Sequence, residues 1–86
     1  GRGEQQTLLQ TRLREAYAIA RNDVAAIIAA GVKDGSFRCD DPLLAAASIL
    51  ATLDGLVLQW LCDRDAFDLD AIAMNLTQMI LRSLQP

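Results

Sequence analysis

The chain has 86 residues, enough for one small domain, and 52% of them are hydrophobic, which is above the usual 45–50%. Its formal net charge is −3 and its eight Lys and Arg are spread along the chain, so it lacks the concentrated basic face that nucleic-acid binding requires. It has no histidine and only two cysteines, which excludes a disulfide framework, the usual zinc sites and histidine-based catalysis.

The first predicted helix runs from about Glu4 to about Asp34. Its apolar residues share one stripe roughly 100° wide on a helical wheel, as expected for a helix with one buried side. The sequence KDGSF ends this helix, because Gly35 suits the left-handed position after a helix and Phe37 can tuck under the helix end. The stripe consists of Leu9, Leu13, Ala16, Tyr17, Ala20, Val24, Ile27 and Ile28.

The second predicted helix runs from about Pro42 to about Asp63, with Asp41 as its N-cap and Pro42 at the first helical position. Its apolar arc covers roughly 240° of the wheel, whereas a core-facing helix needs little more than 100°. Such a helix needs neighbours on at least two sides. The remaining arc holds small or uncharged polar residues, namely Ala45, Ser48, Thr52, Gly55 and Gln59.

The apolar segment from Pro42 to Leu61 is nearly long enough to cross a membrane. Asp54 lies near its centre, where a charge costs about 2.5–3.5 kcal/mol on insertion, and the flanking charged residues are aspartates rather than Lys or Arg. We interpret the segment as a buried helix of a soluble protein without a membrane partner. Since no secretory signal is visible, we expect a cytoplasmic location.

The third predicted helix runs from about Leu69 to about Leu84, with Asp68 as its cap. Its main apolar stripe is accompanied by a second patch, Met74 and Leu81, on another side. Three helices with short turns predict an all-α fold of antiparallel neighbours. The main stripe consists of Leu69, Ile72, Ala73, Leu76, Met79, Ile80 and Leu84.

Two sister helices cannot cover the whole apolar arc of the second helix. We therefore predict a homodimer in which the second and third helices meet their symmetry mates as a four-helix bundle. The periodicity leaves open which side of the second helix faces the first helix and which faces the mate. The predicted interface residues are Leu50, Leu53, Val57, Trp60, Leu61, Met74, Leu76, Met79, Ile80 and Leu81.

Three short motifs follow one another in order, Asp34-Gly35-Ser36-Phe37-Arg38, then Asp41-Pro42, then Asp54-Gly55-Leu56. With this order and spacing, the stretch from about Val24 to Leu84 resembles the C-terminal part of the TetR-type bacterial transcriptional regulators. The resemblance implies a homodimer that binds a small-molecule effector in its helical domain. It also implies a repressor that binds operator DNA through a separate N-terminal helix-turn-helix domain.

Residues 1–86 are expected to be one C-terminal helical domain, with the DNA-binding domain and the middle effector-domain helices of such a regulator outside this chain. We therefore expect this chain not to bind DNA by itself, to form only part of an effector pocket and to need no cofactor. Tyr17 and Asp54 are the candidate ligand-binding residues, because each offers a polar group beside apolar surface. The alternatives are a Tyr17 in the core and an Asp54 that reaches solvent or Arg21.

A second hypothesis is a stand-alone helical module that buries the same faces against a different protein. An enzyme is the least favoured class, because the sequence has no nucleophile–base pair and no metal-binding constellation.

Overall fold

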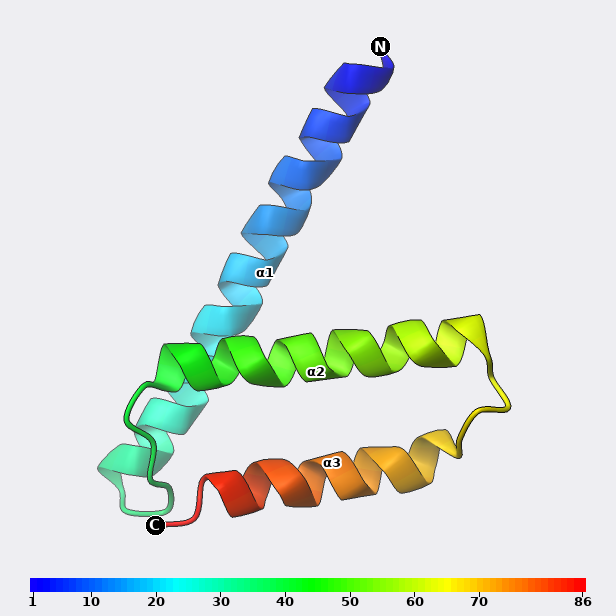
Figure 1. The fold of residues 1–86 in the computed structure, drawn as a ribbon. Helices are drawn as coiled ribbons and strands as arrows, with labels where there is room; N and C mark the ends of the chain where they lie inside the picture. Colours follow the sequence, from blue (N-terminus) through cyan, green and yellow to red (C-terminus); the bar gives the residue numbers. More distant parts are fainter.

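The computed structural model describes all 86 residues as three helices joined by two loops (Figure 1). The helices are α1 (Arg2–Lys33), α2 (Pro42–Cys62) and α3 (Leu69–Ser83). No strand is present, so the predicted all-α class is confirmed. α2 and α3 run antiparallel, while α1 crosses the start of α2 obliquely and extends away from the other two helices (Figure 1).

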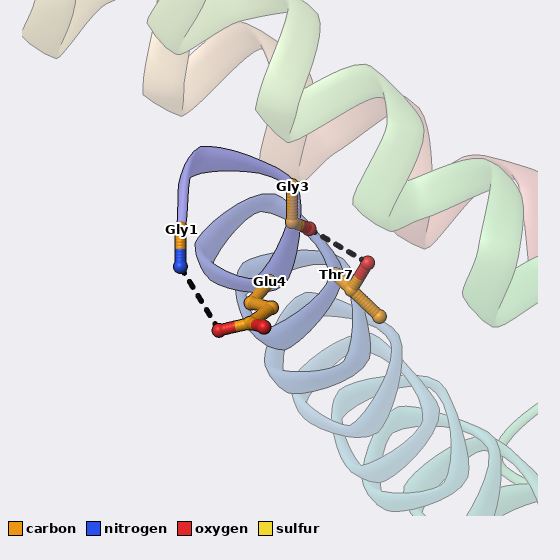
Figure 2. A network of polar contacts seen from close by, with 4 residues as sticks. All are labelled: Gly1, Gly3, Glu4 and Thr7. Carbon is orange, nitrogen blue, oxygen red and sulfur yellow. Dashed lines mark hydrogen bonds and ion pairs between the residues drawn. The ribbon is translucent and has the colours of Figure 1, made fainter.

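The first turn of α1 is held by two exposed polar contacts (Figure 2). The terminal amine of Gly1 donates a hydrogen bond to Glu4 Oε2 over 2.9 Å, and the Thr7 hydroxyl donates to the Gly3 carbonyl over 2.9 Å. The carboxylate of Glu4 also interacts favourably with the positive end of the helix dipole. These contacts order one turn, and they bring no other part of the chain to it.

The end of α1 is fixed by a glycine turn and by the ring of Phe37. Gly35 has a φ of +86°, the left-handed conformation that the sequence predicted for it. The backbone N–H of Phe37 donates to the Gly31 carbonyl over 2.9 Å. A Cβ atom at Gly31 would overlap the Phe37 ring, so the ring needs a glycine at this position. The Ser36 hydroxyl, and after it the Ser36 N–H, which donates to Asp34 Oδ1 over 2.9 Å, lower the pKa of the Asp34 carboxyl group.

The starts of α2 and α3 are capped by the aspartates that the sequence indicated. Asp41 Oδ1 accepts a hydrogen bond from the Leu44 N–H over 3.1 Å. Asp68 Oδ1 accepts from the Asp70 N–H over 3.0 Å and from the Ala71 N–H over 3.4 Å. Each cap satisfies backbone donors that have no partner inside the helix.

The buried part of the chain is small and lies where three helix ends meet (Figure 1). The backbone N–H of Arg38, in the loop after α1, donates to the Leu84 carbonyl over 2.8 Å and so ties the end of α3 to that loop. We call this region the corner, and it contains the four buried residues of the chain. They are Ile28, Gly31, Ala46 and Leu84.

Outside the corner, the chain is an open layer rather than a closed domain. Its principal extents are 51 × 32 × 14 Å, and a single helix with its side chains is already about 10–12 Å wide. The radius of gyration is 15.9 Å, against about 12 Å for a compact domain of this length. The accessible surface is 6677 Å², against about 5,000 Å² for a folded monomer of this mass. The chain therefore leaves much of its apolar surface uncovered.

α2 shows this exposure most clearly, because Ala46 is the only buried residue among its 21 residues. By length and composition alone, with a mean hydropathy of 1.6, the helix could also cross a membrane. The core helices of soluble proteins meet the same criterion, so its apolar surface does not by itself indicate a bilayer.

Candidate functional site

One hollow next to α2 lies between α2 and α1. Tyr17 and Arg21 of α1 line it together with Asp54 of α2, and its volume is about 190 Å³. The two candidate ligand-binding residues, Tyr17 and Asp54, are thus brought to one place from different helices. We call this hollow the α1–α2 pocket. Its remaining lining is apolar and consists of Ala47, Leu50 and Ala51.

The polar groups of the α1–α2 pocket influence one another. Asp54 raises the pKa of the Tyr17 phenol, first through hydrogen bonding and then through its negative charge, with a smaller contribution from burial. At neutral pH the phenol is therefore protonated and can donate a hydrogen bond to the carboxylate. Arg21 lines the same pocket, but the structure contains no ion pair between Arg21 and Asp54. The carboxylate and the guanidinium both face the pocket without neutralising each other directly.

The pocket can hold a polar group beside an apolar body. Its phenol, carboxylate and guanidinium provide hydrogen bonds and charge, while Leu50 and the alanines provide apolar contact. A volume of about 190 Å³ is smaller than the roughly 300–1,000 Å³ of complete ligand sites. A neighbouring hollow of about 350 Å³ shares Arg21 and Ala47 with the α1–α2 pocket, so the cavity continues towards the start of α2.

On its other side, α2 borders a groove of about 370 Å³ between α2 and α3, which we call the α2–α3 groove. None of the residues that line it is charged. Leu76 and Met79, two of the predicted interface residues, line the α3 side. The α2 side is lined by Ala51, Thr52, Gly55, Leu56 and Gln59, and the α3 side by Ile72, Asn75, Leu76 and Met79.

The other predicted interface residues are distributed over several sides of the layer. Leu50 faces the α1–α2 pocket. Trp60 is half-buried, and the guanidinium carbon of Arg64 lies 4.4 Å from the centre of its ring. Ile80 is half-buried as well. The exposed ones are Leu53, Val57 and Leu61 on α2 and Met74 and Leu81 on α3.

Val57 and Gly55 lie on nearly opposite sides of α2, because residues two positions apart are about 200° apart on a helix. A flat seam that contains the groove therefore excludes Val57. The predicted interface consists of large apolar residues, and it therefore does not include Thr52, Gly55 or Gln59. The arc of small residues on the helical wheel was the signal that could have included them.

A comparison with protein families identifies the class of the chain. Residues 2–85 match the family described as the BetI-type transcriptional repressor, C-terminal. The chain belongs to this family. It is thus a C-terminal regulatory domain of the TetR-type transcription regulators, as the resemblance of its motifs indicated, and this class is not one of enzymes. No curated protein and no solved structure matches the chain.

Proposed function

We propose that this TetR-family domain is the dimerisation domain and part of the effector-binding site of a bacterial, cytoplasmic repressor. The observation that supports this proposal is the exposure of α2, which buries only Ala46 within its own chain. Its exposed large side chains include Val57, which is 51% exposed, and Leu58, which is 63% exposed. A soluble protein covers such a surface with a partner.

The size of the uncovered surface fits a second copy of the chain. The accessible surface of 6677 Å² is about 1,700 Å² larger than expected for a compact monomer of this mass. Obligate homodimers bury roughly 1,000–2,500 Å² on each partner. Burial of an area of this size in a homodimer through α2 and α3 brings the accessible surface of the chain into the range expected for a folded protein. The ten predicted interface residues are the candidates for this contact, although they lie on more than one side of the layer.

The α1–α2 pocket, with Tyr17 and Asp54, is our proposal for the part of the effector site that this domain contributes. The first half of α1 exposes three large apolar side chains, Leu8, Leu9 and Leu13, and we expect other helices of the regulator to cover them. A net charge of −3 and the absence of a basic cluster agree with operator binding by another part of the regulator.

The dimer is tested by sedimentation equilibrium over a wide range of protein concentrations. We expect a dimer that dissociates only on strong dilution. A monomer at every concentration would refute the dimerisation role and would favour the alternative, a helical module that binds a different protein.

The effector site is tested by thermal unfolding in the presence of a panel of small polar metabolites, with wild-type protein and the Asp54→Asn variant side by side. A compound that occupies the pocket raises the melting temperature of the wild type, because it binds only the folded state. It raises that of Asp54→Asn much less. If every stabilising compound raises the melting temperature of both proteins equally, the compounds bind outside the α1–α2 pocket.

A further inference from the structure

The α1–α2 pocket contains two opposite charges that do not pair with each other. Arg21 lies on α1 and Asp54 on α2, and both line the pocket. Both ion pairs of the chain lie within residues 1–15, so neither involves Arg21 or Asp54. Asp41 lines the neighbouring hollow together with Arg21, but its Oδ1 accepts the Leu44 N–H and it forms no ion pair with the guanidinium. The pocket therefore offers one positive and one negative group to a bound molecule.

These two charges determine which kind of molecule the pocket accepts. A simple cation would be attracted by Asp54 and repelled by Arg21, and a simple anion would meet the reverse. An uncharged molecule would displace water from both charged groups without supplying a partner for either, which is costly. A molecule that carries an ammonium and a carboxylate together supplies a partner to each group.

We infer that the effector is a small zwitterion, an amino acid with a short carbon chain between its ammonium and its carboxylate. Its carboxylate binds the guanidinium of Arg21, and its ammonium donates to the carboxylate of Asp54. This inference rests on the proposed effector site and names the class of molecule that the site takes. Because the two residues come from different helices, the bound zwitterion bridges α1 and α2.

The other lining residues suit the middle of such a molecule. Ala47, Leu50 and Ala51 provide apolar contact for its methylene groups. The protonated phenol of Tyr17 donates to Asp54, and a carboxylate can accept several hydrogen bonds, so it can also accept from the ammonium. The pocket of about 190 Å³ has room for a short chain rather than for a drug-sized body.

The test compares 4-aminobutanoate, butanoate and butylamine by NMR titration of the full chain. The first carries both charges, and each of the other two carries one of them on a chain of the same length. Tyr17 is the single tyrosine, so its ring signals report whether a molecule occupies this pocket. The spacing of the two charges is varied with 3-aminopropanoate and 5-aminopentanoate. We expect the best of the three zwitterions to bind about 10-fold more tightly than butanoate or butylamine, because each of these leaves one charged residue without a partner.

Two variants assign each charge of the ligand to its residue. In Arg21→Gln, the best zwitterion should lose its advantage over butylamine and keep its advantage over butanoate. In Asp54→Asn, it should lose its advantage over butanoate and keep that over butylamine. Arg12→Gln is the matched control, because Arg12 is an exposed arginine of the same helix that does not line the pocket, and it should bind the zwitterion as the wild type does. Circular dichroism checks that each variant keeps its helices.

The outcomes separate the class of the effector from the effector site. If butylamine, butanoate or an uncharged compound of the thermal panel occupies the pocket as tightly as every zwitterion, the inference is wrong and the proposed site still stands. If a zwitterion binds the wild type and both pocket variants equally, its charges do not meet Arg21 and Asp54, and the inference is wrong as well. If no compound of any charge responds to a substitution in the pocket, the proposed effector site fails, and this inference fails with it.

Discussion

Two of the helical glycines, Gly31 of α1 and Gly55 of α2, have different surroundings. Gly31 is buried in the corner, where the Phe37 ring packs against it and the Phe37 N–H donates to its carbonyl. Gly55 borders a groove in which nothing from its own chain approaches an added Cβ atom. The corner is complete within one chain, and the groove is not. The comparison indicates which part of the fold is closed by its own chain.

The corner also has the polar contacts that complete it. The Arg38 N–H closes it by donating to the Leu84 carbonyl, and Gly35 turns the chain between α1 and this loop. The α2–α3 groove has apolar walls and amides but no third helix to cover them. Substitutions in the corner should therefore affect folding, and substitutions in the groove should affect association.

The largest effect is expected from Leu84→Ala in the corner. Leu84 is 5% exposed, and a buried Leu→Ala change costs about 2–5 kcal/mol. We expect the lower end, about 2–3 kcal/mol of the free energy of unfolding, because the corner is small and can collapse partly. Urea unfolding followed by circular dichroism measures this loss. Since Leu84 does not line the groove, the dimer dissociation constant measured without urea should stay close to that of the wild type. If Leu84→Ala weakened the dimer in the absence of urea, the corner and the groove would not be independent regions.

Gly31→Ala is expected to cost about 1–2 kcal/mol, because the added methyl group displaces the Phe37 ring and this overpacking exceeds the gain of about 1 kcal/mol in helix propensity. The measurement is the same urea titration. The matched control is Gly31→Ala in a Phe37→Ala background, where the overlap is gone and the substitution should be neutral or stabilising. A destabilisation of equal size in both backgrounds would mean that the ring is not the reason for this glycine.

The C-terminal end of α2 should contribute much less to the free energy of unfolding than the corner. The Arg64 guanidinium lies 4.4 Å from the Trp60 ring centre, and such an exposed cation–π contact is worth about 0.5–1 kcal/mol. Arg64→Ala should lower the free energy of unfolding by about that amount and change the fluorescence of Trp60, the single tryptophan. Arg12→Ala is the control, because Arg12 makes only an exposed contact of 3.9 Å to Glu15 and its loss should cost less than about 0.5 kcal/mol. If both variants lowered the free energy of unfolding equally, the contact between Arg64 and Trp60 would not contribute to stability.

The local features of this fold could be predicted because local chemistry determines them. An aspartate before a helix supplies a cap, and a glycine in the left-handed region ends one, so Asp41, Asp68 and Gly35 took the predicted roles. The helical wheel also predicted that α2 could not be covered by its own chain. Each of these conclusions needs only residues close together in the sequence or on one helix.

The identity of each neighbour could not be predicted, because periodicity defines a face and not what covers it. Tyr17 and Asp54 were chosen separately for their chemistry, and only the crossing of α1 over α2 brings them together with Arg21. Gly55 was assigned to the arc of small or uncharged polar residues on the second helix, but its lack of any neighbour within the chain is visible only in three dimensions. Val57 was predicted as an interface residue because its side chain is large and apolar. The groove on the other side of α2 is visible only in the structure.

The smallest effect concerns a third region, the α1–α2 pocket, which a single chain forms but leaves partly open. Asp54 raises the pKa of Tyr17 above its ordinary value of about 10, so the folded state favours the protonated phenol. The stability from this contact is fully present below the ordinary value and is lost as the pH rises through the raised pKa. Tyr17 is the single tyrosine, so the near-ultraviolet absorbance of tyrosinate reports its titration directly. In Asp54→Asn the midpoint should fall towards the ordinary value, whereas Asp34→Asn, a change at the end of α1, should leave it in place. An unchanged midpoint in Asp54→Asn would show that the phenol and the carboxylate do not interact in solution, and the pocket would then lack the polar pair on which its proposed role depends.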